Sequence, residues 1–382
     1  MIKLGLSYDE LSSALGMSSI ILSDKMVEEK LKNVIFIVKK DSVCICFYNS
    51  LTFCRTEVEK VVVEGIEDEK TWIFQVKAAD LTKVLSGFSS LYKTKVDSIR
   101  FEENKSKIKI SIDEVALEEA DSRLNQTSVF NLDNVPLTES VRKDIEMEFP
   151  DDPEIVFKGD LDLYVSSLLP LMNSASNLES KLNFADDYVF VIAAYMSVFF
   201  KNKLSEQMKN MTLGYSSVSL IKRLCDTVEG NDISVKKTDK YLCMQAGNTE
   251  AFMRHQPVKI KYQQYIKMMS RDNGVVLNRL YFKDVLKRVG MVSTEGKLTI
   301  LDDGDITIET PNFNQMIPTE KTRGEVSGVN FKFSINLFER LIVGSDKIFP
   351  EEIFLYIVKA ESRYALFFTD KKGAWFSMTQ VH

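Results

Sequence analysis

Residues Gly274–Pro318, GVVLNRLYFKDVLKRVGMVSTEGKLTILDDGDITIETPNFNQMIP, contain one complete folding unit of this chain. The stretch opens with a short apolar run, Val275–Leu277, which predicts a strand. Apolar residues then recur at the spacing that lines one face of an α-helix. They are Phe282, Val285, Leu286 and Val289. Gly290 follows them, where a helix C-cap favours a residue that can adopt positive φ.

Two short strand-like runs complete the unit. They span 297–301 and 305–310, and Asp302, Asp303 and Gly304 between them are typical of a hairpin turn. The unit is therefore a strand, a helix and a small antiparallel meander. It cannot bury its apolar face alone, so we expect the chain to repeat it.

The repeat extends along the whole chain. Six segments each carry a helix-spaced apolar face followed by short strands. The helix faces lie near Leu11, Leu81, Leu161, Ile221, Phe282 and Phe338. No common solenoid has a period of this kind. Pairing the copies predicts three similar α+β domains, at residues 1–140, 141–262 and 263–382.

Several local expectations concern single strands and the link between domains. Residues 53–63 are expected to form one strand, and 98–102 and 107–112 two more. A further strand is expected to begin near Val115. The acidic segment Pro136–Pro153 is interpreted as a linker between domains.

Composition restricts the class of protein. With 382 residues, 45% of them hydrophobic, the chain can bury large cores. Its 55 acidic and 49 basic residues give a net charge of -6, which argues against a wholly basic nucleic-acid coat but allows local basic patches. The N-terminus lacks a signal-peptide pattern, and no apolar run approaches the roughly 18 residues of a membrane span. We expect a soluble, cytoplasmic protein.

The cysteines and histidines do not indicate a metal site or a redox framework. The five cysteines are an odd number without framework spacing, which suits a reducing compartment. Cys44 and Cys46 alternate with apolar residues, so a buried strand explains them better than half of a metal site. His255 and His382 are too far apart in the sequence for an HExxH pair.

Two segments resemble a known family. The segment YQQYIKMMSRDNGVVLNRLYFKDVLKRVGMVSTEGKLTI, from Tyr262, is similar to the part of the bacterial-type DNA polymerase sliding clamp (the β subunit) that crosses from its second domain into its third. The C-terminal AWFSMTQVH resembles the family's short apolar tail. The likeness covers essentially the whole chain, although the first domain is recognisable mainly by architecture. Such divergence would fit a virus-encoded clamp, for example from a bacteriophage.

The resemblance implies a DNA clamp fold and a mechanism based on topology. Two copies would join head to tail into a ring of six domains, with helices lining the hole and antiparallel sheets outside. The ring would encircle duplex DNA, tether the replicative polymerase and slide without gripping any base sequence. In a virus the protein would act in the host cytoplasm.

Basic residues opposite the apolar helix faces are the candidates for the DNA-facing surface. They are Lys77, Lys83, Lys222, Arg223, Arg279, Lys283, Lys287 and Arg340. Arg279, Lys283 and Lys287 stand four residues apart and are expected to form one stripe. Each alone is typical of a solvated helix face, but recurrence in four units favours a lumen. The first and third helices carry acidic residues instead: Asp9, Glu10, Asp160 and Asp162.

The resemblance also implies a pocket for short peptides of the polymerase and the clamp loader, between the second and third domains. Its residues would be Tyr195, Met196, Val198, Gln263, Lys267, Met268, Phe376, Ser377 and Met378. Methionine and aromatic side chains suit a pocket that accepts several peptides. The family's Thr-Asp-Gly-His-Arg turn is absent near Tyr195, and Gln263 and Thr379 replace its pocket proline, so peptide preference is expected to differ.

The ring interface is the last expectation from the resemblance. Met291 and Val292 of one subunit would meet Val115 and Leu117 of the other through sheet edges.

Catalysis is not indicated. The sequence has no GxxxxGK[ST] loop and no GxGxxG opening a helix, and the Asp-rich pairs at 151–152 and 302–303 are explained by a linker and a turn. We expect no cofactor and no metal. Two alternatives stay open: a monomeric clamp-fold factor that holds DNA by charge, and a non-enzymatic viral structural or interaction protein. A nucleotide-processing enzyme is a distant third.

Overall fold

The structure is a computed structural model of the 382-residue chain. It describes residues 2–22, 32–48, 51–58, 61–67, 70–89, 91, 94–104, 106–117, 122–172, 181–192, 196–227, 230–268, 271–343, 351–360, 363–370 and 375–381. Within these ranges no helix is long and apolar enough to cross a membrane.

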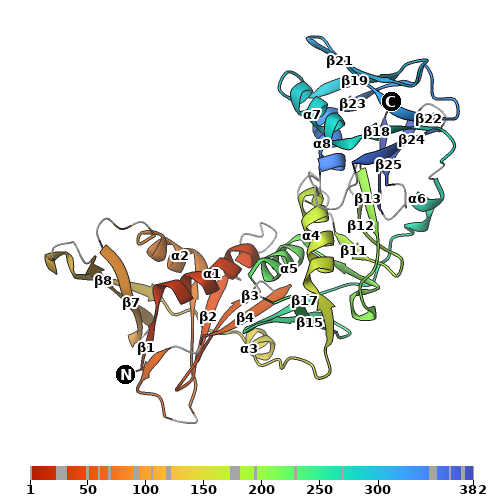
Figure 1. The fold of residues 1–382 in the computed structure, drawn as a ribbon. Helices are drawn as coiled ribbons and strands as arrows, with labels where there is room; N and C mark the ends of the chain where they lie inside the picture. The colour runs from red at the N-terminus through yellow and green to blue at the C-terminus, as the bar shows by residue number, and fades with distance from the viewer. Residues whose placement is uncertain are drawn as a thin grey trace. The chain divides into compact units, whose positions relative to one another are not determined.

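The predicted sixfold repeat is present. Each copy is a strand, a helix and three consecutive strands (Figure 1). The first three copies are β1 (Lys3–Leu6), α1 (Tyr8–Leu22), β2 (Asn33–Val38), β3 (Val43–Tyr48) and β4 (Thr52–Val58); β6 (Trp72–Lys77), α2 (Ala78–Ser86), β7 (Thr94–Asn104), β8 (Lys107–Ala116) and β9 (Gln126–Asp133); and β10 (Glu154–Phe157), α4 (Lys158–Met172), β11 (Leu182–Phe184), β12 (Tyr188–Ile192) and β13 (Met196–Lys201).

The last three copies follow the same order. They are β14 (Met211–Leu213), α5 (Tyr215–Thr227), β15 (Asp232–Lys237), β16 (Tyr241–Ala246) and β17 (Thr249–Arg254); β18 (Gly274–Asn278), α7 (Arg279–Gly290), β19 (Glu295–Ile300), β20 (Ile306–Thr310) and β21 (Phe313–Ile317); and β23 (Asn330–Ser334), α8 (Ile335–Val343), β24 (Glu352–Ala360), β25 (Arg363–Thr369) and β26 (Trp375–Val381). Additional elements are β5 (Val62–Glu64), α3 (Glu139–Ile145), α6 (Gln263–Met268), β22 (Thr319–Arg323) and two 3-10 turns, Ser122–Leu124 and Glu206–Met208.

Consecutive copies exchange their first strands. The first strand of each copy pairs with the meander of the other copy in the same pair. These antiparallel pairs are β1 with β7 and β6 with β2, β10 with β15 and β14 with β11, and β18 with β24 and β23 with β19. The exchange couples the six copies in three pairs, because each meander takes its outer strand from the other copy of its pair.

The meanders join one another through their third strands. β4 pairs with β17 in the eight-stranded sheet β10-β15-β16-β17-β4-β3-β2-β6, and β13 pairs with β26 in the nine-stranded sheet β14-β11-β12-β13-β26-β25-β24-β18-β22. The other two sheets are β5-β1-β7-β8-β9 and β21-β20-β19-β23. In these two sheets the third meander strands, β9 and β21, are outermost. Four of the six third strands are therefore joined, and the other two are paired on one side only among the described residues.

Contacts between residues divide the chain into two compact units, and the boundaries of these units do not fall at residues 140 and 262. One unit comprises residues 1–157 and 219–254, and the other comprises 158–218 and 255–382. The reason lies in the sheets, because β4 and β17 come from different predicted domains yet are adjacent strands. The three-domain division stays a prediction about the repeat.

In the first unit, helices lie on one face of the eight-stranded sheet and α3 lies on the other (Figure 1). Phe36 of β2 stacks on Phe74 of β6 and lies 5.0 Å from the ring of Phe101 of β7, so both sheets of this unit share one core. On the opposite face, Val141 and Ile145 of α3 pack against Ile35, Cys46, Phe53, Cys243 and Phe252.

In the second unit, α7 and α8 pack against each other and against the nine-stranded sheet. Phe282 of α7 and Phe338 of α8 both contact Phe368 of β25, at ring-centroid distances of 6.4 and 5.5 Å. The short helix α6 covers the other face, where Tyr265 lies 6.0 Å from the ring of Phe199.

Several local predictions need correction. Gly290 is the last residue of α7 and does not have positive φ; the cap is Met291 in helical conformation. The strand expected at 53–63 is interrupted between β4 and β5, and the linker contains α3, which Thr138 caps by accepting a hydrogen bond from Val141 N. The strand expected near Val115 is wrong: Val115 ends β8, and the next strand begins at Gln126.

Candidate functional surfaces

Of the four basic residues predicted on the segments of α2 and α5, two are exposed and two are half-buried. Lys77, which ends β6, and Lys83 in the last turn of α2 are exposed. Lys222 of α5 is half-buried and forms an ion pair with Asp226 four residues later, so its charge is partly neutralised. Arg223 packs over α1, because a Cβ built on Gly16 would lie 3.1 Å from its Nη2 atom. Arg223 thus contacts a neighbouring helix.

The predicted stripe on α7 is wrong for two of its three members. Arg279 is 4% exposed and Lys283 is 7% exposed, whereas Lys287 is exposed. A helix advances 100° per residue, so Arg279 and Lys283 border the apolar face of Phe282 and Leu286 instead of lying opposite it. Arg279 is also fixed where β24 begins, since its backbone N–H donates to the carbonyl oxygen of Glu351 at 2.6 Å.

Sequence reasoning missed Arg288. It is exposed and lies opposite the buried stripe of α7. Its Nε donates to the carbonyl oxygen of Asp284, one turn earlier, at 3.3 Å. The basic residues of this helix were selected by a spacing of four residues, and a helical-wheel plot would have identified Arg288 as well. The side chain of Arg340 on α8 lies outside the described part of the chain.

One acidic residue on α1, Glu10, has a local role. The Ser7 hydroxyl donates to the Glu10 carboxylate at 2.7 Å, and the Glu10 backbone N–H donates to Ser7 Oγ at 3.2 Å. The Ser7 side chain therefore caps the helix start by satisfying one of its N–H groups, and the Glu10 carboxylate orients that hydroxyl.

The residues predicted for one peptide pocket do not lie on one surface. β13 and β26 are adjacent, with Met196 opposite Thr379 and Val198 opposite Ser377. Met196, Val198 and Ser377 are buried on the face where Phe200 contacts Tyr164 of α4, at 6.0 Å. Gln263, Lys267 and Met268 are exposed on α6, which packs on the opposite face. Adjacent residues of a strand point to opposite faces, so Met196 and Val198 cannot share a surface with α6.

Three other members of that set have side chains outside the described part of the chain. Tyr195 lies outside the described residues altogether, as do the side chains of Phe376 and Met378. The backbone register of the last two is known: Phe376 lies opposite Phe199, and Met378 lies opposite Ser197.

The predicted interface residues lie near sheet ends, but neither Val115 nor Leu117 lies on an edge strand. β8 is an interior strand between β7 and β9, and its pairing with β9 ends at Glu114. Val115 is half-buried, and Leu117 is exposed just past the strand. The edge of this sheet is β9. Met291 and Val292, after α7, are 83% and 52% exposed.

The open edge of β9 presents both backbone and apolar groups. Asn134 N donates to Ser106 O at 3.0 Å, so in this register Leu132 and Phe130 bond to β8, while Val129 and Asn131 direct their N–H and C=O groups outward. Val129 is 52% exposed.

β21 presents a matching edge. The two-residue turn between Thr310 and Phe313 makes that pair a hydrogen-bonded one, so Asn314 and Met316 face the open side. Met316 is 53% exposed. Gln315, on the other face, donates to the Tyr281 hydroxyl of α7 at 3.0 Å.

Acidic residues of the 302–305 turn are used in the hairpin. Gly304 has φ +93°, Asp303 accepts a hydrogen bond from Asp305 N at 3.0 Å, and Asp305 accepts one from Thr319 N at 2.8 Å. Among the residues that the structure describes, no cluster of three or more His, Cys, Asp or Glu could hold a metal ion.

Comparison with known proteins identifies the fold. No family model matches the sequence, and no curated protein matches it. The structure is similar over its whole length to DNA polymerase sliding clamps: that of Bacillus subtilis (12% identity, TM-score 0.73, 100% of this chain and 99% of that one), the DNA polymerase III β chain of Streptococcus pneumoniae (12%, 0.74, 100% and 100%) and the β subunit of Thermotoga maritima (15%, 0.69, 100% and 99%). The chain has the sliding-clamp fold, as the sequence predicted.

Proposed function

We propose that this chain is a sliding clamp: two copies close head to tail around duplex DNA and tether the replicative polymerase to its template. The full-length likeness to DNA polymerase III β subunits supports this function. In this proposal the protein acts as a processivity factor and performs no chemistry of its own.

The observation that carries the proposal is the pair of open third strands. Within the chain, third strands join to give sheets of eight and nine strands. The sheets that end in β9 and β21 have five and four strands. Pairing β9 of one copy with β21 of a second would make a nine-stranded sheet by the same rule. Because each copy has one strand of each kind, two such contacts close a ring.

The chemistry of the two edges favours this pairing. An antiparallel register that sets Val129 opposite Met316 also sets Phe130 opposite Gln315. The side chains that face the helices in the two sheets would then lie on the same face of the joined sheet. This register joins two exposed apolar side chains on the outer face. Met291 and Val292 follow α7 at the end of the sheet where β21 begins, and would then meet the C-terminal end of β9 rather than Val115 and Leu117.

The proposed contact with DNA is weak and independent of sequence. Encirclement prevents escape, so the helix-face cations need only screen phosphates while the ring slides. The exposed Lys77, Lys83, Lys287 and Arg288 are the best candidates among the described residues, and the half-buried Lys222 and Arg223 rank below them.

We also propose that short peptides of the polymerase and the clamp loader dock beside α6. Its exposed Gln263, Lys267 and Met268 border the face of β13 and β26 that carries Ser197. An apolar methionine next to a cation suits an amphipathic peptide.

Light scattering across a dilution series tests the ring. A chain of 43.6 kDa should appear at twice that mass. Retention on nicked circular DNA should exceed retention on a linear fragment of equal length, because a ring slides off ends. A species of 43.6 kDa at every concentration, with equal retention on both DNAs, would favour the monomeric clamp-fold factor.

A further inference from the structure

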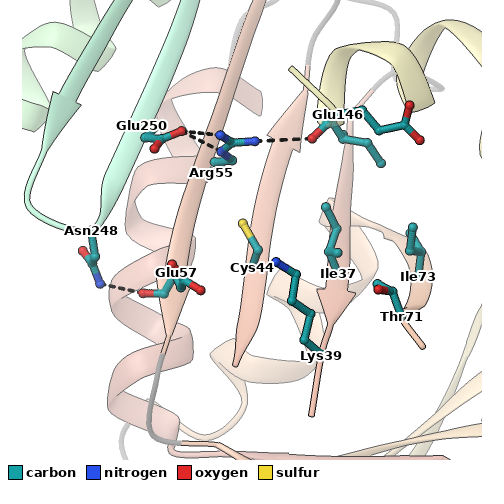
Figure 2. A pocket seen from close by; sticks show the side chains of 11 residues that line it. Ile37, Lys39, Cys44, Arg55, Glu57, Thr71, Ile73, Glu146, Asn248 and Glu250 are labelled. Carbon is teal, nitrogen blue, oxygen red and sulfur yellow. Dashed lines mark hydrogen bonds and ion pairs between the residues drawn. The ribbon is translucent and has the colours of Figure 1, made fainter. Parts of the chain in front are cut away.

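A cavity of about 460 Å³ opens on the face of the eight-stranded sheet that carries α3 (Figure 2). Its floor is one row of side chains that the strand register places side by side: Ile73 of β6, Ile37 of β2, Cys44 of β3 and Glu57 of β4. α3 ends at Ile145, above the neighbouring row, so this row is left uncovered. The volume lies within the range of ligand sites in proteins.

One wall of the cavity is fixed by Arg55. Its Nε donates to Glu250 Oε2 at 2.7 Å, and its Nη1 donates to the carbonyl oxygens of Met147 at 2.8 Å and Ile145 at 3.4 Å. Arg55 and Glu250 are opposite one another where β4 meets β17 (Figure 2). The guanidinium therefore holds the end of α3 to both halves of the sheet, and the cavity is preformed.

An unpaired strand edge borders the cavity. Ala78 N donates to Lys32 O at 3.1 Å, so the residues of β6 that bond to β2 are Trp72, Phe74 and Val76. Gln75 and Ile73 face the other way. The edge at Gln75 is occupied, because its carbonyl accepts from Val135 N at 2.9 Å and its N–H donates to Asn134 Oδ1 at 3.3 Å. For Ile73, no such partner is present among the described residues.

The rim charges select the ligand. Arg55 is neutralised by Glu250, which leaves the exposed carboxylates of Glu57 and Glu146 against the single ammonium group of Lys39. The exposed charges that line the cavity are thus acidic on balance, and they lie beside the apolar Ile37 and Ile73 of the floor. A cationic side chain beside an apolar one complements this lining.

We propose that this cavity docks an extended peptide segment of a partner protein. The segment pairs its backbone with Ile73 as an added strand, places an apolar side chain over Ile37 and Ile73, and directs a lysine or arginine toward Glu146. Strand addition supplies affinity through main-chain hydrogen bonds, and the cavity supplies specificity through alternate side chains. The site needs one copy of the chain only, so it does not depend on ring formation.

Cys44 allows the site to be observed directly. It is half-buried on the cavity floor, and the other four cysteines are buried. Its contact with the Cys46 thiol, with Sγ atoms 3.8 Å apart, lowers the pKa of Cys44, which favours reaction with a maleimide. A peptide in the cavity should slow that reaction.

The test uses a display library of random twelve-residue peptides, selected on the full-length chain. We expect enriched peptides to contain an apolar residue near a basic one and to protect Cys44 from N-ethylmaleimide, as read by mass spectrometry. Their affinity, measured by fluorescence anisotropy, should fall about fivefold or more for Glu146→Lys. The matched control is Glu139→Lys at the other end of α3, which makes the same charge change outside the cavity and should leave the affinity unchanged.

A second variant tests the strand edge. Ile73→Pro removes the outward N–H at a position where an edge strand tolerates proline, and should abolish binding. If this variant does not fold, Glu146→Lys and Cys44 protection still decide the question. Enriched peptides that leave Cys44 reactive, that bind Glu146→Lys and Glu139→Lys equally, or that are uniformly acidic would overturn the proposal, as would a library without enrichment.

Discussion

Replacing Val129 by proline should open the proposed ring without unfolding the chain. The N–H of Val129 points to the open edge of β9, so within one copy it makes no ladder hydrogen bond. Proline is tolerated on an edge strand whose N–H faces solvent. In the ring, the same N–H would donate to β21 of the second copy, and the pyrrolidine ring would take its place.

The size of the effect follows from the hydrogen-bond pattern. Losing one interface hydrogen bond and leaving its acceptor unpaired costs about 1–2 kcal/mol. A closed head-to-tail dimer contains two equivalent contacts, so the total is about 2–4 kcal/mol, which raises the Kd about thirty- to a thousandfold. Met316→Pro, on the opposing edge, should have the same effect for the same reason.

Sedimentation equilibrium of each variant gives a sharp test. Both variants should be monomeric at concentrations where the wild type is dimeric. Thermal unfolding by circular dichroism should be unchanged in each variant. A wild-type Kd in both variants would refute the pairing of β9 with β21.

Three further predictions concern other parts of the molecule. Arg55→Met should destabilise the first unit by about 2 kcal/mol in denaturant unfolding, because it leaves the Glu250 carboxylate and the carbonyls of Ile145 and Met147 without their donor. A double-mutant cycle with Glu250→Gln should show non-additivity, and additive losses would contradict the coupling. Replacing Lys287 and Arg288 by glutamine should reduce the salt dependence of duplex-DNA binding by about 0.9 for each phosphate that these side chains neutralise in the wild type, and an unchanged slope would remove both from the DNA-facing set. Burial, and to a smaller extent a hydrogen bond with Asp144, raises the pKa of Tyr48 from 10.0 to about 12. The folded state therefore holds the phenol proton more tightly than the unfolded state, which contributes stability in full below pH 10 and loses it as the pH rises toward 12. The denaturation midpoint should fall over that pH range in the wild type more than in Tyr48→Phe.

Much of the fold was predictable because each copy of the repeat has apolar residues at helical spacing. The face of Phe282, Val285, Leu286 and Val289 predicted α7, and all four residues are buried. The helix start was also readable, since Asn278 accepts a hydrogen bond from Tyr281 N at 3.0 Å as an N-cap should. Such signals are local, so a single sequence contains them.

The errors arose where the answer depended on tertiary structure. The alternation of residues 113–117 resembles the start of a strand, but pairing with β7 makes it the end of β8, and the true edge strand begins at Gln126. α3 is short, and its two buried residues, Val141 and Ile145, are too few for a periodic signal. Arg279 and Lys283 were misassigned because spacing alone does not say which side of a helix the sheets cover. No motif could have revealed the cavity beside α3, since its floor combines one residue from each of four strands.

The two proposed interactions use strand edges of different length. An unpaired strand edge invites association, and its length limits how much backbone a partner can pair with it. β9 has eight residues, the most of any outermost strand in the four described sheets, and no hydrogen bond to its outward groups is described for Val129 or Asn131. β6 has six, but residues 134–136 occupy its edge at Gln75 and leave only the part near Ile73. The long edge therefore suits a permanent partner such as a second copy of the chain, and the short one, which borders a cavity with an acidic rim, suits a peptide that binds and leaves.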